Sequence, residues 1–246
     1  MIKDLDPNKT YNLSAFIYVD RFFYGLFDDQ QLEYKSNFSF KDLLDLKRQI
    51  SKSNITKVKV NKAAIISSIA PAGLIEYDDF SFNTYKSFFR GHFPEEFLSV
   101  SNYHAQKLKE QKLYAAFAFP REIEKLLKTY AAEVEFVHIS KVLADYLTKQ
   151  KSDVFLILIN DQYCSMVYNK DKTTSFANTF RLTGELDSIY YTRKVFEAMD
   201  IKDSQPCYIL NQSAPDSYIQ GLTTYLSNVN IITTEDLELS EALLCV

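Results

Sequence analysis

The sequence is short of glycine. Five glycines stand among its 246 residues, where average usage of about 7% would give roughly 17. Phosphate-binding loops need glycine because backbone N–H groups must approach the anion without a Cβ in the way. The chain contains no GxG, no double glycine and no GxxxxGK. A Walker loop and a Rossmann fingerprint are therefore excluded.

Long apolar runs and paired cysteines are also missing. The longest strongly apolar run, residues 154–159, falls far short of the roughly 18–20 residues that span a bilayer, so no membrane span is expected. Residues 1–10 are charged and unlike a secretory signal. Three cysteines, at positions 164, 207 and 245, form no CxxC, which fits a cytoplasmic protein. With 32 acidic and 28 basic residues, there is no electrostatic reason to expect nucleic acid.

Apolar patterns predict three hairpin-linked strands at the start of the chain, followed by a helix. The strands are expected at residues 13–19, 22–27 and 32–40. Ser39 can cap the helix, and its apolar face would comprise Leu43, Leu44, Leu46 and Ile50. Further strands are expected at 58–60, 64–70, 113–119 and 134–139. Pro120 would begin a helix before the last of these strands, and Ser140 would cap a helix after it.

The opening pattern returns in the second half of the chain. Laid over the first half without gaps at an offset of 141, Asp20 falls on Asp161 and Asn37 on Asn178. A long helix, a strand at 207–210, a helix from Pro215 and a strand at 229–232 complete this half. Each half therefore has the order β-β-β-α-β-α-β. We expect two domains, residues 1–139 and 140–246, with an aromatic-rich insertion at 77–103 in the first.

A duplicated unit of this order resembles the actin, sugar kinase and Hsp70 superfamily, whose lobes resemble ribonuclease H. Residues 113–180 resemble its pilus-assembly and cell-division branch, through YAAFAFPREIEKLL, AEVEFVHISKVLADYL and DVFLILIND. The overall layout resembles a bacterial family of unknown function, domain-of-unknown-function family 3822. The resemblance implies an α/β protein with mixed sheets, built as two ribonuclease-H-like lobes in an actin-like ATPase fold. The family's arginine and glycine after the third strand match Arg181 and Gly184.

The nucleotide motifs of that superfamily are altered here. Active members turn from the first to the second strand of each lobe through DxG, where backbone N–H groups hold phosphates and the carboxylate positions hydrated Mg²⁺. This chain keeps Asp20 and Asp161 but follows them with Arg-Phe-Phe and Gln-Tyr-Cys. The adenosine loop, normally a double glycine, reads Asn-Gln-Ser at 211–213. Asp also simply stabilises turns, which is the favoured interpretation of both. No cofactor is therefore expected; ATP and Mg²⁺ remain the alternative, bound by Asp20, Asp161 and Gly184.

Nine of the 27 residues from 77 to 103, here called the aromatic belt, are Phe or Tyr. The belt would fill the seam between the lobes, which is the favoured interpretation because exposed Phe is rare. Alternatively it forms a protein-binding surface, with Tyr85, Phe88 and Phe89 as anchors. The three histidines, at 92, 104 and 138, lack metal-ligand spacing, and no nucleophile motif is present. No metal site and no catalytic residue are therefore expected.

Together these patterns predict a non-catalytic cytoplasmic protein that acts as a protein-interaction or scaffold module and has lost nucleotide binding. Its protein partner is not identified by the sequence, and a homodimer is left open. The alternative is a divergent actin-like ATPase that binds ATP and Mg²⁺ between the lobes.

Overall fold

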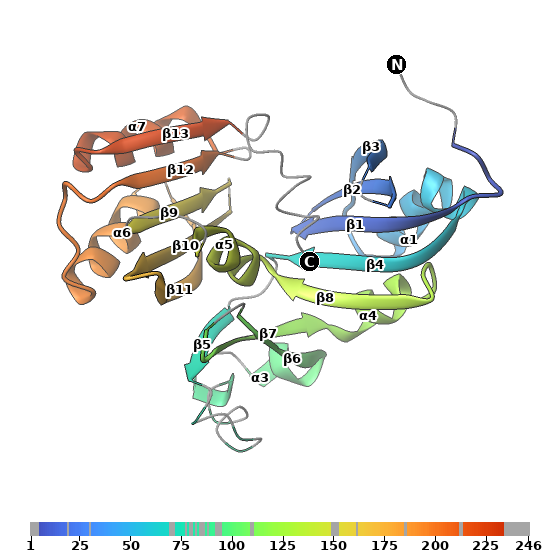
Figure 1. Cartoon of the computed structure of the whole chain (residues 1–246), viewed down its shortest axis with the longest axis horizontal. Coiled ribbons are helices and arrows are strands. Elements are labelled where there is room, and N and C mark those ends of the chain that lie inside the picture. Colours follow the sequence, from blue (N-terminus) through green and yellow to red (C-terminus); the bar gives the residue numbers. More distant parts are fainter. Residues whose placement is uncertain are drawn as a thin grey trace.

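The computed structural model describes residues 5–18, 20–29, 31–68, 72–76, 78, 81, 83, 87, 89–91, 95–108, 111–148, 153–160, 162–184, 186–211 and 214–233. Over these residues the chain forms two five-stranded mixed sheets and a smaller three-stranded antiparallel sheet (Figure 1). None of the helices in the described ranges is long and apolar enough to cross a membrane.

The first sheet has the order β3-β2-β1-β4-β8. Its strands are β1 (Thr10–Tyr18), β2 (Arg21–Asp28), β3 (Gln31–Ser39), β4 (Lys59–Ser67) and β8 (Glu133–His138). The first three strands are antiparallel neighbours, and β4 and β8 continue the sheet in parallel with β1. Two helices, α1 (Leu43–Lys52) and α4 (Arg121–Leu127), pack on one face of this sheet, and a short 3-10 helix, η1 (Asn54–Lys57), follows α1.

The second sheet repeats this arrangement in the order β11-β10-β9-β12-β13. Its strands are β9 (Val154–Ile159), β10 (Tyr163–Lys170), β11 (Thr173–Arg181), β12 (Cys207–Asn211) and β13 (Val229–Thr233). Its helices α6 (Asp187–Ala198) and α7 (Asp216–Tyr225) pack on one face. The first three strands of the second half, β9, β10 and β11, end within one residue of the positions that the 141-residue offset gives from β1, β2 and β3. The expectation that residues 13–19 and 154–159 belong to central strands of separate sheets is confirmed for β1 and β9.

Helix α5 (Ile139–Leu147) lies between the two sheets (Figure 1). Strand β9 is buried on both faces: Phe155, Ile157 and Ile159 pack in the core with α6 and α7, whereas Leu156 and Leu158 pack in the core with α5. The core around α5 also contains Phe16 and Ile66 from the first sheet. One apolar core therefore joins the two lobes. The division of the chain into domains at residues 139 and 140 stays a prediction.

The three-stranded sheet is an insertion between β4 and α4. It has the order β5-β7-β6, from β5 (Ala72–Glu76), β6 (Ser101–Lys107) and β7 (Leu113–Pro120), and the short helix α3 (Glu95–Ser99) precedes β6. The insertion thus reaches beyond the predicted 77–103 on both sides. The sequence did not reveal this sheet because β5 is only five residues long and contains Gly73, and because β6 is largely polar.

The inserted sheet is bonded to both lobes. Buried Gln111, between β6 and β7, donates from Nε2 to Thr174 Oγ1 of the second lobe at 3.0 Å and accepts from the Thr174 N–H at 2.8 Å. On the other side, Glu124 of α4 accepts hydrogen bonds from Asn102 Nδ2 at 2.9 Å and Lys128 Nζ at 2.6 Å, and lies 3.0 Å from His104 Nε2. The inserted sheet therefore bridges the two lobes.

Three local expectations about element ends are corrected by the structure. The strand signals at 58–60 and 64–70 belong to one strand, β4, whose polar interruption lies where Lys62 Nζ approaches Glu133 at 3.6 Å. Helix α1 is capped by Asp42, whose side chain accepts from the Asp45 N–H, because Ser39 still belongs to β3. Helix α5 is capped by His138, whose Nδ1 accepts from the Ser140 N–H.

We predict that replacing Ile157 by Ala in β9 lowers the free energy of unfolding by about 2–5 kcal/mol, because Ile157 is fully buried in the second core. Chemical denaturation followed by circular dichroism measures this change. Ile231→Ala is the matched control, because Ile231 is 53% exposed on the edge strand β13, and it should change stability by less than about 1 kcal/mol. Equal losses for the two variants would contradict the central position of β9.

Candidate functional site

The carboxyl ends of the central strands in the two lobes point toward each other. In Figure 1, β1 and β4 run toward the second sheet, while β9, β12 and β13 run toward the first. In open α/β sheets, ligands bind outside the carboxyl ends of the strands. A ligand site is therefore expected at the loops after β1, β9, β11 and β12. They carry Asp20, Asp161, Gly184 and residues 211–213, the stretch that matches the superfamily's adenosine loop.

The turn after β1 leads directly into a buried aromatic residue of the first core. Asp20 is exposed, and its backbone carbonyl accepts from the Phe40 N–H at 2.7 Å. Phe22 stands where a glycine would be expected in the superfamily motif, and it is fully buried and stacks on Phe38 with ring centroids 5.1 Å apart. This residue is thus part of the first core, and its role there is to fill space.

The turn after β9 is bonded to its own chain. Asp161 lies outside the described residues. Its neighbour Asn160, only 2% exposed, accepts hydrogen bonds at Oδ1 from the Gln162 N–H at 2.9 Å and the Tyr163 N–H at 2.7 Å. In the superfamily, N–H groups of this turn hold phosphate. Here the N–H groups of Gln162 and Tyr163 donate to the side-chain amide oxygen of Asn160 instead.

The loop that contains Gly184 shows the same arrangement with a carboxylate. Asp187, in the first turn of α6, accepts at Oδ2 from the Thr183 N–H at 2.6 Å, the Thr183 hydroxyl at 2.7 Å and the Gly184 N–H at 3.1 Å. These bonds, led by that from the Thr183 backbone, lower the pKa of the Asp187 carboxyl below its ordinary value. A Cβ at Gly184 would meet no atom within 4 Å, so the glycine is not required by packing.

The stretch 211–213, which matches the superfamily's adenosine loop, begins with an asparagine that accepts a hydrogen bond from a residue further along the chain. Asn211 Oδ1 accepts from the Ala214 N–H at 2.8 Å, just before α7. Gln212 and Ser213 lie outside the described residues. Five backbone N–H groups at this edge of the second lobe, those of residues 162, 163, 183, 184 and 214, therefore donate to side-chain oxygens of Asn160, Asp187 and Asn211.

Only part of the aromatic belt lies in the described residues. Phe89 is 1% exposed and packs against Tyr103, with ring centroids 4.9 Å apart, in the core of the three-stranded sheet. The expectation that Phe89 anchors a partner at the surface is therefore corrected, because its ring is buried within its own chain. Tyr85 and Phe88 lie outside the described residues, so their role as anchors stays a prediction.

Glu124 and His138 are held within the fold by their neighbours. Burial alone would raise the pKa of the Glu124 carboxyl, but hydrogen bonds from Lys128, Asn102 and His104 outweigh it and lower that pKa. His138 is fully buried, and His92 lies outside the described residues. Within the described part of the chain, no three His, Cys, Asp or Glu side chains gather in a way that could hold a metal ion.

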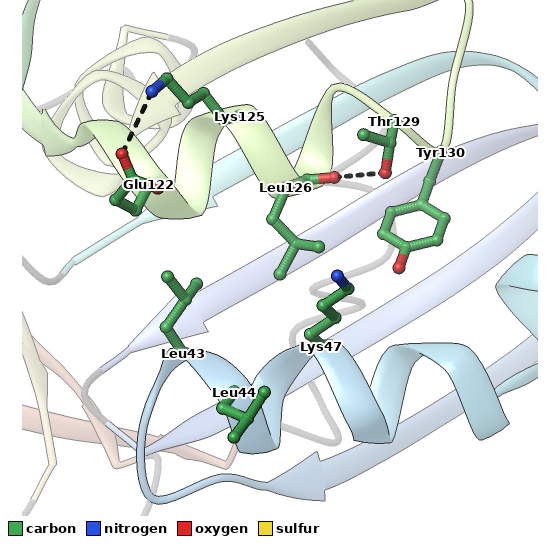
Figure 2. Close-up of a pocket in the computed structure, with 8 residues that line it drawn as sticks. All are labelled: Leu43, Leu44, Lys47, Glu122, Lys125, Leu126, Thr129 and Tyr130. Carbon is green, nitrogen blue, oxygen red and sulfur yellow. Dashed lines mark hydrogen bonds and ion pairs between the residues drawn. The ribbon is translucent and has the colours of Figure 1, made fainter.

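One surface feature was missed by the sequence analysis. A groove of about 530 Å³ runs between α1 and α4 on the outer side of the first lobe (Figure 2). Its lining comprises Leu43, Leu44, Lys47, Glu122, Lys125, Leu126, Thr129 and Tyr130. Leu44 was placed on the buried face of α1 with Leu46, yet it is 77% exposed. The sequence contained the signal for this exposure. Leu44 and Leu46 are two positions apart, which is a rotation of about 200° around a helix, so they lie on opposite faces.

Solved structures of the same fold align with nearly the whole chain. A protein of Bacteroides thetaiotaomicron VPI-5482 with an actin-like ATPase fold and unknown function aligns with a TM-score of 0.81 and 15% identity, over 96% of each chain. The PilM–PilN type IV pilus biogenesis complex aligns at 0.58 and 12% identity, over 90% of this chain and 88% of that one. The cytoplasmic domain of EpsL, an inner-membrane component of the Vibrio cholerae type II secretion system, aligns at 0.51 and 11%, over 96% and 93%.

These alignments define the class of the protein, an α/β protein with an actin-like ATPase fold. The chain belongs to the family of proteins of unknown function DUF3822, whose model matches residues 3–229. The resemblance drawn from the sequence is confirmed for the actin-like fold and for the family. The sequence matches no curated protein.

We predict that Asp187→Asn lowers the melting temperature at about pH 7, because a neutral amide accepts the three hydrogen bonds at Asp187 less strongly than a carboxylate. The folded-state pKa of Asp187 is lowered, so its carboxylate stabilises the fold above the ordinary aspartate pKa of about 3.9. That stabilisation is lost as the pH falls through the lowered pKa. Thermal unfolding of the wild type and of Asp187→Asn, from about pH 7 down to below the lowered pKa, measures the difference in melting temperature.

The matched control is Asp216→Asn, a change of an exposed carboxylate in the first turn of α7. It should leave the melting temperature nearly unchanged. A wild-type advantage over Asp187→Asn that persisted below the lowered pKa would show that the carboxylate charge is not its source.

Proposed function

We propose that this chain is a non-catalytic bacterial protein that has kept the actin-like fold, has lost nucleotide binding between its lobes, and acts in the cytoplasm by binding another protein. The observation that carries the proposal is the set of five backbone N–H groups bonded to Asn160, Asp187 and Asn211. A nucleotide phosphate would have to displace these internal acceptors, and it would meet a carboxylate at Asp187.

Steric and electrostatic terms both act against a phosphate. The Asp187 carboxylate and a phosphate carry the same sign, so bringing them to one set of donors is unfavourable, more so where water is excluded. In the first lobe, Phe22 stands in place of the motif's glycine, and its ring is buried in the core. The internal acceptors are tethered within a few residues of their donors, so they lose less freedom on bonding than a free ligand does.

A binding role is supported by the kind of protein that shares this fold. PilM is a component of a pilus biogenesis complex with PilN, and EpsL is a component of a secretion system. A cytoplasmic location is supported by the thiols of Cys164 and Cys207, which are free and buried. A partner that co-purifies in fixed stoichiometry from native cells would fit the proposal, and a chain recovered only as a monomer would not.

We predict that millimolar Mg-ATP gives no binding heat in titration calorimetry and no phosphate release above the buffer rate. Binding at 100 times Kd would add about 2.7 kcal/mol to stability, so a thermal shift is a second readout. No shift is expected. An established actin-like ATPase measured in parallel controls for the assay.

The opposite outcome would restore the ATPase alternative. That outcome is micromolar affinity together with hydrolysis that is lost on Asp161→Ala or Asp20→Ala. Retention of binding in both variants would point to a different ligand pose and would equally contradict the loss of nucleotide binding.

A further inference from the structure

The groove between α1 and α4 is lined by apolar side chains on both sides. Leu43 is 37% and Leu44 is 77% exposed, and both lie on the α1 side. From the α4 side, partly buried Leu126 and Tyr130 complete the apolar lining, with Tyr130 next to Lys47 (Figure 2). Single exposed leucines need no explanation, but apolar residues gathered in a concave surface favour an apolar ligand.

Of the charged side chains that line the groove, two form an ion pair and one lysine does not. Lys125 Nζ lies 3.2 Å from Glu122, so this pair is neutralised within the lining. Lys47 points into the groove in Figure 2, and no carboxylate among the described residues forms an ion pair with it. A ligand that combines leucine-like side chains with a carboxylate would therefore match both features of the groove.

The last thirteen residues of the chain have this composition. Residues 234–246, TEDLELSEALLCV, contain four carboxylates and four leucines, with no Lys, Arg or His. They follow Thr233, the last residue of β13. No other stretch of this length in the sequence combines so many leucines with acidic residues and no basic one.

The direction of β13 favours this segment as the occupant of the groove. Strand β13, after which the segment begins, runs toward the first lobe (Figure 1) and ends at the edge of the second lobe that faces it. Helix α1 begins just after β3, which runs parallel to β1, so Leu43 and Leu44 lie at the edge of the first sheet that faces the second lobe. Thirteen residues span at most about 43–47 Å when extended and about 20 Å as a helix.

We propose that residues 234–246 bind in the α1–α4 groove of their own chain, with leucines against Leu44 and Leu126 and a carboxylate beside Lys47. The groove is then a surface that the protein covers with its own segment. A protein partner of similar chemistry would have to compete with that segment. This inference is independent of the nucleotide question, so either can fail without the other.

A disulfide trap in the full-length chain tests the proposal. Cys245 lies within the segment and supplies one thiol. The other two cysteines are unreactive, because burial raises the pKa of Cys164 and raises that of Cys207 to about 12. Leu44→Cys and Thr129→Cys each place a second thiol in the groove lining. Under mild oxidation, at least one should form an intramolecular disulfide with Cys245, detected by non-reducing peptide mapping.

The matched control is Tyr225→Cys, an exposed position at the end of α7 outside the groove. Position 225 is closer to Cys245 along the chain, so random encounters would favour the control. We expect trapping at a groove position to be about tenfold faster than at 225. Adding Lys47→Glu should slow groove trapping about threefold or more, and unchanged circular dichroism would verify folding.

Equal or faster trapping at position 225 would overturn the proposal. Groove trapping that Lys47→Glu leaves unchanged would also overturn it, because the carboxylate would not lie beside Lys47. Disulfides formed only between chains, seen as a doubled mass without reductant, would assign the groove to a second copy and would overturn binding within one chain.

Discussion

Burial of helix α5 between the two sheets is the interaction on which the rest of the structure depends. Six of its nine residues are buried, and its core contains Phe16 and Ile66 from one sheet and Leu156 and Leu158 from the other. Burying one such aliphatic side chain is worth about 1.5–3 kcal/mol, so separating the lobes would expose several contributions at once. The carboxyl edges of the two sheets face each other because this helix and its neighbours hold them there.

The chemistry of those edges follows from the need to satisfy every backbone donor. A turn with free N–H groups needs water, an anion or a side-chain acceptor. In the second lobe the side chains of Asn160, Asp187 and Asn211 supply acceptors. This solution needs no glycine, because no external anion has to approach the backbone. It gives a physical reason why an actin-like fold persists in a chain with five glycines.

Much of this fold could be predicted from the sequence, because its central strands are covered on both faces and therefore carry strong apolar signals. The duplicated order and the 141-residue offset depend on such strands, above all β1 and β9. The inserted sheet could not be predicted, since β6 is polar and half-buried. The site residues were predicted by motif, but the acceptor role of Asp187 depends on a turn that brings it back to Thr183. Burial of Phe89 depends on Tyr103 and on a cluster that includes Leu98 of α3 and Ala116 of β7, which local spacing does not encode.

The paired hydrogen bonds between Gln111 and Thr174 have a consequence for molecular recognition. Together with α5 and the hydrogen bonds of Glu124, they tie the inserted sheet to both lobes, so moving one lobe relative to the other would break these contacts. Association normally loses free energy to the ordering of mobile parts, and a surface that is already ordered avoids that loss. A partner that touches both lobes would therefore select one fixed spacing between them, and its affinity would report on shape complementarity rather than on closure.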